Sequence, residues 1–136
     1  EVHDVSIDKL APDPELNGLI ADLPGRKLVF TNGDERHATR ILARLEMTAL
    51  FDGVFHLEHA NFIPKPNLVT FERMMAAHAV AADRAAFFED SPRNLKPAFE
   101  LGMKTILVGP KAVGNDDPFI DFRGPDLKTF LSRQEM

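Results

Sequence analysis

The chain has 136 residues, which is enough for about one domain. Apolar residues make up 44% and charged residues 27%, which argues against a largely disordered chain, and no apolar run approaches the length of a membrane helix. The formal net charge of −5 makes binding of nucleic acid by bulk charge a poor expectation. The chain has no cysteine, which excludes disulfides and thiolate chemistry and fits a cytoplasmic location. We therefore expect neither a nucleic-acid partner nor a membrane.

Apolar segments of strand length alternate with segments of helical period, which predicts an α/β fold with a parallel sheet and flanking helices. The first helix is expected to have Asp13 as its cap, and the fourth Ser91. Helices are expected to start near Pro14, Arg36, Asn67, Pro92 and Asp126. Strands are expected at residues 27–31, 51–57, 85–89, 104–108 and 119–122, and a loop at residues 111–118.

The first polar site follows the expected strand 27–31, where Thr31, Asn32 and Gly33 lead into a helix. Ligands of open parallel sheets bind outside the carboxyl ends of the strands. A threonine hydroxyl and backbone N–H groups at such a turn can hold an anionic oxygen. Asn-Gly is also an ordinary turn pair, so a purely structural role stays open.

The second site is Lys65, which stands between Pro64 and Pro66. The two prolines stiffen the backbone and place the lysine in an extended segment. A rigidly held ammonium group suits a phosphate partner. The alternative is an ordinary solvated lysine in a loop, and the residue taken alone favours that alternative.

The third site is Glu89 and Asp90, which end the expected strand 85–89. Two adjacent carboxylates at the end of a buried strand are costly unless they are paired or bound to a metal. Their hard oxygen atoms suit Mg²⁺, which keeps several waters and takes few protein carboxylates. The alternative is that Asp90 only helps to cap the helix that follows.

Two further polar clusters are less promising. His56, Glu58 and His59 superficially resemble a metal cluster, but on a strand His56 shares a face with Glu58 and not with His59. We therefore expect structural or solvent-exposed roles for these three residues. Asp116 and Asp117 precede a proline in a loop that contains Gly and Asn, which predicts a solvated turn.

The order and spacing of the three sites resemble the haloacid dehalogenase (HAD) superfamily of phosphohydrolases. Lys65 lies 34 positions after Thr31, and Asp90 lies 25 positions after Lys65. Thr31 matches the superfamily's second motif, Lys65 its third, and Glu89-Asp90 its fourth. The segments KLVFTNGDERHATRIL, FIPKPNLVTFERM and FFEDSPRNL most resemble the pyrimidine 5'-nucleotidase subgroup. The resemblance is clearest over residues 3–110.

The superfamily's first motif has no counterpart in this sequence. That motif, Asp-x-Asp, ends a buried strand; its first Asp is the nucleophile and its second the general acid/base. The sequence contains no Asp-x-Asp, and Asp4, Asp8 and Asp13 follow no apolar strand of the right kind. In the superfamily this strand lies in the middle of the sheet, and an inserted helical cap follows it. We therefore expect residues 1–136 to be the C-terminal part of a HAD-like core domain, with the nucleophile strand and the cap outside this chain.

The resemblance implies a phosphate monoester hydrolase that works through an aspartyl-phosphate intermediate on a small phosphorylated metabolite, here a pyrimidine 5'-nucleotide. It implies catalytic roles for Thr31, Lys65 and Asp90, with Mg²⁺ held by Asp90 and with Glu89 orienting a metal-bound water or Lys65. Phosphate binding is implied for Thr31, Asn32, Gly33 and Lys65. The missing N-terminal segment of the same protein is an expected partner, and we expect this chain alone to be inactive.

Three alternatives stay open. Substrate choice in this superfamily depends largely on the cap, so a phosphoglycolate phosphatase-like or a dehalogenase-like hydrolase fits the same motifs. A non-catalytic HAD-like binding domain fits them as well.

Loss of the central strand would leave unpaired backbone groups on the strands that flank it, each costing about 1–3 kcal/mol. We therefore expect strands 27–31 and 85–89 to flank a slot filled from outside this chain rather than to pair with each other.

Overall fold

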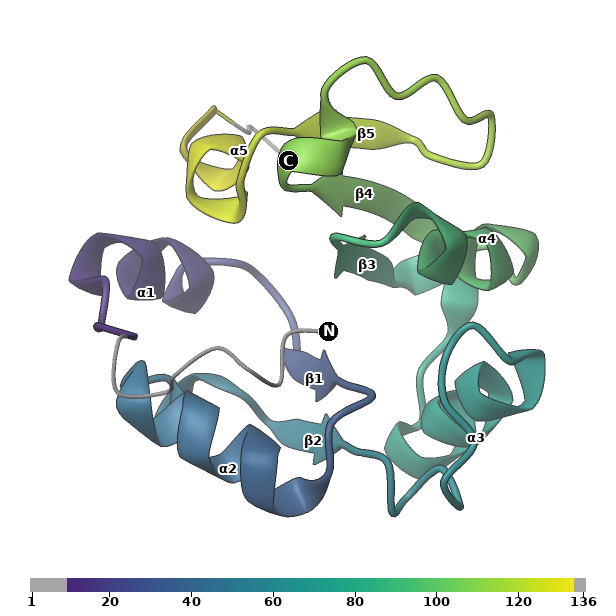
Figure 1. Ribbon diagram of the computed structural model, residues 1–136, viewed down its shortest axis with the longest axis horizontal. Helices are drawn as coiled ribbons and strands as arrows, with labels where there is room; N and C mark the ends of the chain where they lie inside the picture. The colour runs from purple at the N-terminus through teal and green to yellow at the C-terminus, as the bar shows by residue number, and fades with distance from the viewer. Residues whose placement is uncertain (1–9, 134–136) are drawn as a thin grey trace. The chain divides into compact units, whose positions relative to one another are not determined.

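The computed structural model describes residues 10–133. The chain divides into two compact units, Glu1–Phe62 and Ile63–Met136. Each unit combines parallel strands with flanking helices (Figure 1), so the predicted α/β class is confirmed. Asp4 and Asp8 lie outside the described residues.

The first unit contains two parallel strands, β1 (Leu28–Phe30) and β2 (Gly53–Phe55). Helix α1 (Pro14–Ala21) precedes β1, and helix α2 (Glu35–Arg44) connects the two strands and lies alongside β2 (Figure 1). A single turn of 3-10 helix, Thr48–Leu50, leads from α2 towards β2. The crossover through a helix is what two parallel strands require. It brings the ends of β1 and β2 to one edge of the sheet.

Local sequence signals explain where α1 and α2 begin. Asp13 accepts a hydrogen bond from the Leu16 N–H at 3.2 Å, as predicted, and Asp34 accepts one from the His37 N–H at 2.8 Å. Each carboxylate satisfies an N–H group that has no partner inside its helix. Because Asp34 is the cap of α2, this helix starts one residue before the predicted Arg36.

Helix α2 ends at Arg44, three residues before Met47, where its apolar pattern predicts the end. Glu46 has a left-handed backbone with φ 57°, and the Met47 N–H donates to the Leu42 carbonyl at 2.8 Å. The Glu46 N–H donates to the Ala43 carbonyl at 3.1 Å. These two bonds form a Schellman motif, which stops a helix by satisfying its last carbonyls.

The second unit contains three parallel strands in the order β3-β4-β5. The strands are β3 (Ala86–Glu89), β4 (Lys104–Val108) and β5 (Phe122–Gly124). The helices are α3 (Leu68–His78), α4 (Pro92–Glu100) and α5 (Leu127–Arg133), with 3-10 turns at Ala82–Arg84 and Pro110–Ala112.

A buried apolar cluster joins α4 to this sheet. Its members are Leu95, Leu107, Ala112 and Ile120, with Phe87 and Phe119 packed against them. Burial of such side chains is the main favourable term in folding. The cluster fixes β3 and β4, so the polar residues that follow β3 sit on a rigid base.

The prediction of a strand at residues 119–122 is wrong for all but its last residue. The buried Thr105 hydroxyl donates to the Phe119 carbonyl at 2.7 Å, and the Asp121 carboxylate accepts from the Thr105 N–H at 2.9 Å. These bonds hold residues before Phe122 in a turn, and β5 begins only at Phe122. The predicted loop 111–118 likewise begins inside the 3-10 turn Pro110–Ala112.

The loop before β5 is only partly the solvated turn that was predicted. Asp116 is exposed. Asp117 is partly buried and accepts a hydrogen bond from Asn115 Nδ2 at 2.8 Å, and its carbonyl accepts one from Arg123 at 2.8 Å. The turn is therefore braced by its own side chains.

Among residues 10–133, β1 pairs with β2 and β3 pairs with β4, and the two pairs belong to separate sheets. Neither sheet contains both of the strands that were expected to flank the slot, 27–31 and 85–89. What fills the slot stays a prediction. No helix within residues 10–133 is both long enough and apolar enough to cross a membrane.

Candidate functional site

Lys65 and Glu89 form a buried ion pair in the second unit. Lys65 Nζ lies 2.8 Å from Glu89 Oε1, and the two side chains are 6% and 9% exposed. The ammonium group also lies over the Phe87 ring, 5.3 Å from its centroid. The interpretation of Lys65 as a solvated loop lysine is therefore wrong.

The segment before α3 holds Lys65 in place. The buried Thr70 hydroxyl donates to the Ile63 carbonyl at 2.6 Å, and the Asn67 N–H donates to the Pro64 carbonyl at 3.2 Å. Asn67 also caps α3, and this helix begins near Asn67 as predicted. The backbone on both sides of Lys65 is thus anchored to the first turns of α3.

Both carboxylate oxygens of Glu89 are engaged. Oε1 accepts from Lys65, and Oε2 accepts from the N–H groups of Asp90 and Ser91 at 3.0 and 3.1 Å. Burial by itself would raise the pKa of Glu89, but the charge of Lys65 and these hydrogen bonds outweigh it and hold the pKa below its ordinary value. Ser91 occupies the cap position of α4 as predicted, but its side chain makes no capping hydrogen bond.

Asp90 is the member of the carboxylate pair whose pKa is raised. Its side chain is exposed, and a hydrogen bond with Glu89, partial burial and the charge of Glu89 together raise its pKa, while Lys111 acts in the opposite direction. The chain after β4 passes close by, because a Cβ at Gly109 would lie 3.6 Å from the Asp90 Cβ. Gly109 has φ 121°, a conformation that favours glycine. A cation beside Asp90 would offset the repulsion from Glu89.

Asn94 is a polar residue of this region that sequence reasoning missed. It lies in the first turn of α4, is 8% exposed, and its Oδ1 atom has no hydrogen-bond partner among the described residues. An unsatisfied buried carbonyl is costly and is rare in native proteins. Asparagine is unfavourable inside helices, and its place in the predicted helix after Ser91 is the one signal in the sequence that points to Asn94.

The oxygen atoms of Asp90 and Asn94 are of the hard type that Mg²⁺ prefers. Within residues 10–133, no group of three or more His, Asp or Glu side chains is arranged to hold a metal ion. Mg²⁺ needs few protein ligands because it keeps several of its waters, so the oxygen atoms of Asp90 and Asn94 are of a type that could hold it.

The turn after β1 brings Thr31 and Gly33 together in the first unit. The Gly33 N–H donates to Thr31 Oγ1 at 2.9 Å, so the hydroxyl accepts this bond and keeps its own proton to donate. A Cβ at Gly33 would lie 3.1 Å from His37 Cδ2 and 3.3 Å from Thr31 Oγ1. The turn is therefore closely packed around Gly33. Asn32 lies between the two and is exposed.

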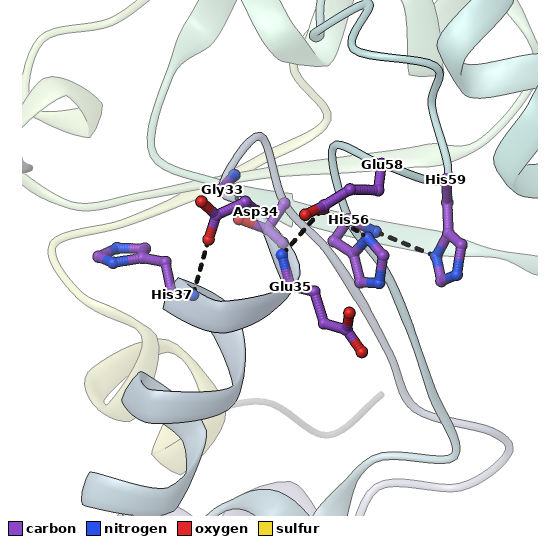
Figure 2. A network of polar contacts seen from close by, with 8 residues as sticks. Gly33, Asp34, Glu35, His37, His56, Glu58 and His59 are labelled. Atoms are coloured by element: carbon purple, nitrogen blue, oxygen red, sulfur yellow. Dashed lines mark hydrogen bonds and ion pairs between the residues drawn. The ribbon is translucent and has the colours of Figure 1, made fainter.

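His56, Glu58 and His59 form a second polar group in the first unit (Figure 2). His56 is buried, and its Nδ1 atom lies 3.1 Å from Glu58 Oε1, close enough for an ion pair although the contact lacks hydrogen-bond geometry. The ring of His59 stacks on that of His56, with centroids 3.7 Å apart. The pairing of His56 with Glu58 is confirmed, but the prediction that His56 does not meet His59 is wrong. Strand β2 ends at Phe55, so the strand alternation no longer applies.

A family model described as haloacid dehalogenase-like hydrolase matches residues 6–108. Phosphate metabolism protein 8 of Saccharomyces cerevisiae is 29% identical to the chain over 113 residues, which cover 74% of this chain and 35% of that protein.

Solved structures share the fold at low sequence identity. The L-2-haloacid dehalogenase from Xanthobacter autotrophicus has a TM-score of 0.73 at 18% identity, covering 93% of this chain and 62% of that one. The magnesium-bound HAD hydrolase YfnB from Bacillus subtilis has a TM-score of 0.73 at 19% identity, covering 88% and 54%. A HAD phosphatase from Thermococcus onnurineus has a TM-score of 0.69 at 20% identity, covering 88% and 54%. The chain thus spans about a third of the curated relative and just over half of these structures.

Proposed function

We propose that this chain, which belongs to the haloacid dehalogenase-like hydrolase family, carries the phosphate- and metal-binding part of a phosphate monoester hydrolase. One observation carries the proposal. A buried Lys65–Glu89 ion pair lies directly beside the exposed Asp90, whose raised pKa marks a carboxylate that a cation would stabilise. Carboxylates whose pKa values are shifted by specific partners are candidates for functional sites.

Groups of this chain have different roles in the proposed phosphoryl transfer. The Thr31 hydroxyl and the Asn32 N–H bind phosphate oxygens, and Gly33 keeps their turn compact. Lys65 places a fixed positive charge where the transferring group develops negative charge. Glu89 orients Lys65 through the 2.8 Å contact between them, which supports the second of its two implied roles.

Asp90 is the residue that would hold Mg²⁺, with the unsatisfied Asn94 carbonyl as a further oxygen ligand in the same segment. The ion would neutralise charge between the phosphate and an anionic nucleophile. Lys65 and the Thr31 turn would each bind oxygen atoms of the substrate's phosphate group.

The nucleophile of this proposal is an aspartate outside this chain, supplied by an N-terminal segment of the same protein. It would form an aspartyl-phosphate that water then hydrolyses. The substrate is a small phosphorylated metabolite, and the motif segments favour a pyrimidine 5'-nucleotide. The name of the yeast relative, a phosphate metabolism protein, agrees with phosphate chemistry. A cytoplasmic setting suits a chain without cysteine.

The test compares three substrates on the longer protein that contains this chain. Uridine 5'-monophosphate, phosphoglycolate and L-2-chloropropionate are incubated with Mg²⁺ or with EDTA, and released phosphate or chloride is measured. We expect Mg²⁺-dependent phosphate release that is fastest with the nucleotide. The Asp90→Asn variant should lose it, whereas Asp116→Asn, a change at an exposed loop aspartate, should keep it. Chloride release would favour the dehalogenase-like alternative, and no turnover of any substrate would favour the binding domain.

A further inference from the structure

We infer that Glu58 is a positioning residue for the phosphate-binding turn, residues 31–33. This inference rests on the proposed function, because it names the residue that fixes the geometry of the same turn. Glu58 lies outside the turn itself, and none of the three segments that carry the family resemblance contains it.

Glu58 reaches across from the end of β2 to the start of α2 (Figure 2). Its Oε1 atom accepts a hydrogen bond from the Glu35 N–H at 2.9 Å, which is the first N–H of the helix. The neighbouring Leu57 N–H donates to the Gly33 carbonyl at 3.0 Å. Both bonds connect the segment after β2 to the segment that runs from the turn into α2.

The Glu58 carboxylate is itself held in position. Its Oε1 atom lies 3.1 Å from Nδ1 of His56, a ring that is buried and stacked on His59. The His56 N–H also points towards His59 Nδ1, at the long distance of 3.5 Å. A long, exposed glutamate side chain would otherwise rotate freely and lose entropy on capping a helix.

The turn has little room to move if this anchor is lost. Gly33 already lies against Thr31 and His37 so closely that even a methyl group would crowd it. If the start of α2 at Glu35 shifts, we therefore expect the Thr31 hydroxyl to move relative to the backbone N–H groups of Asn32 and Gly33. Displacements of about 1 Å in such groups can cost as much as 10²-fold in rate.

The negative charge of Glu58 works against phosphate binding, so we expect Glu58 to act on the turn through its hydrogen bond to the Glu35 N–H. A second carboxylate, Asp34, already caps α2, so the helix start carries two negative groups near a turn that should bind an anion. Each of them repels phosphate. Glu58→Gln keeps an acceptor oxygen for the Glu35 N–H and removes the charge, whereas Glu58→Ala removes both.

The experiment measures the inhibition constant of inorganic phosphate on the longer protein, together with the amide chemical shifts of Gly33 and Glu35. We expect Glu58→Ala to weaken phosphate binding by the order of tenfold and to shift both amides. Glu58→Gln should bind phosphate as tightly as the wild type or more tightly, and Glu58→Asp, which retains a carboxylate on a shorter stem, should be intermediate. Asp13→Ala is the matched control, because it removes a helix cap of the same unit far along the chain from the turn.

Two results would overturn the inference while leaving the proposed function intact. One is a Glu58→Ala protein that binds phosphate like the Asp13→Ala control, although Thr31→Ala weakens binding. The other is a Glu58→Gln protein as impaired as Glu58→Ala, since the charge would then matter and not the acceptor. If wild-type protein shows no phosphate inhibition and Thr31→Ala changes nothing, the proposed function and the inference both fail.

Discussion

The ion pair of Lys65 and Glu89 should matter for the stability of the fold, because both side chains are almost wholly shielded from water. Replacing Lys65 by methionine leaves the Glu89 carboxylate buried without its partner. We expect Lys65→Met to lower the free energy of unfolding at pH 7 by about 3–5 kcal/mol. The double variant Lys65→Met/Glu89→Gln should recover much of this loss. Urea unfolding checks it, with Lys111→Met as the exposed control; a Lys65→Met loss no larger than that of the control would contradict the buried pair.

Lys65 should also matter for turnover. Its ammonium group is placed to stabilise charge that develops on the transferring phosphoryl group, and removing one such group costs roughly 10²–10³-fold in kcat. We expect Lys65→Ala to show this loss in steady-state phosphate release by the longer protein, measured on its folded fraction. A kcat near that of the wild type would leave Lys65 with only its structural role as partner of Glu89.

The contributions of the Glu89 and Asp90 carboxylates to the stability of the fold change with pH in opposite directions. The pKa of Glu89 is lowered from its ordinary value of 4.5, so its contribution to stability is present above that pH and is lost as the pH falls through the lowered pKa. The pKa of Asp90 is raised from 3.8, so the folded protein binds this proton more tightly than the unfolded chain. The contribution of Asp90 to stability therefore falls as the pH rises from 3.8 through the raised pKa.

It follows that Asp90→Asn should raise the melting temperature at pH 7 in EDTA while abolishing metal-dependent turnover. Near pH 3 the wild-type carboxyl is protonated in both states, so the two melting temperatures should converge. Thermal unfolding at the two pH values checks this. A variant that melts lower than the wild type at pH 7 would mean that the charged carboxylate stabilises the fold.

Position at strand ends is what made Thr31, Glu89 and Asp90 visible in the sequence. Lys65 was visible through its prolines, but its burial was not, because it depends on the contact with Glu89 24 positions away. The stacking of His56 on His59 was missed for a similar reason, since it depends on the turn that follows β2.

At the scale of elements, helix starts were the most predictable features. Asp13 acts as the cap that the sequence predicts, and α3 begins beside Asn67 as expected, because a helix start depends on residues within one turn. Strand β5 was misplaced because Thr105, in another strand, holds the preceding apolar residues in a turn. Long-range hydrogen bonds of that kind leave no periodic pattern in the sequence.

Strand β5 and helix α5 meet closely enough to predict the effect of a methyl group. A Cβ at Gly124 would lie 2.9 Å from the Phe130 Cβ, and Phe130 is buried. We expect Gly124→Ala to destabilise the protein by about 1–3 kcal/mol. Gly18→Ala in α1 is the matched control, because nothing lies within 4 Å of its Cβ position and alanine favours helices. Thermal unfolding should show opposite shifts for the two variants; a neutral Gly124→Ala would contradict the packing of Phe130 against β5.

At the scale of the whole molecule, this chain spans 35% of its yeast relative and 62% or less of the three structures compared with it. In the proposed function, the described residues supply the charged groups of Lys65 and Asp90 and the turn that would bind phosphate. The sequence contains no Asp-x-Asp from which the covalent step could start. The proposal therefore divides the reaction between this chain and a segment outside it.

Turnover of p-nitrophenyl phosphate by the purified 136-residue chain tests this division most directly. Circular dichroism first establishes that the chain is folded, and the longer protein serves as the active reference. We predict Mg²⁺-dependent release of p-nitrophenol by the longer protein and none by the chain alone, because the proposed phosphate-binding groups, Lys65 and the Thr31 turn, and the proposed metal ligand, Asp90, cannot replace an aspartate nucleophile. Mg²⁺-dependent turnover by the chain alone, lost in Asp90→Asn, would contradict the account.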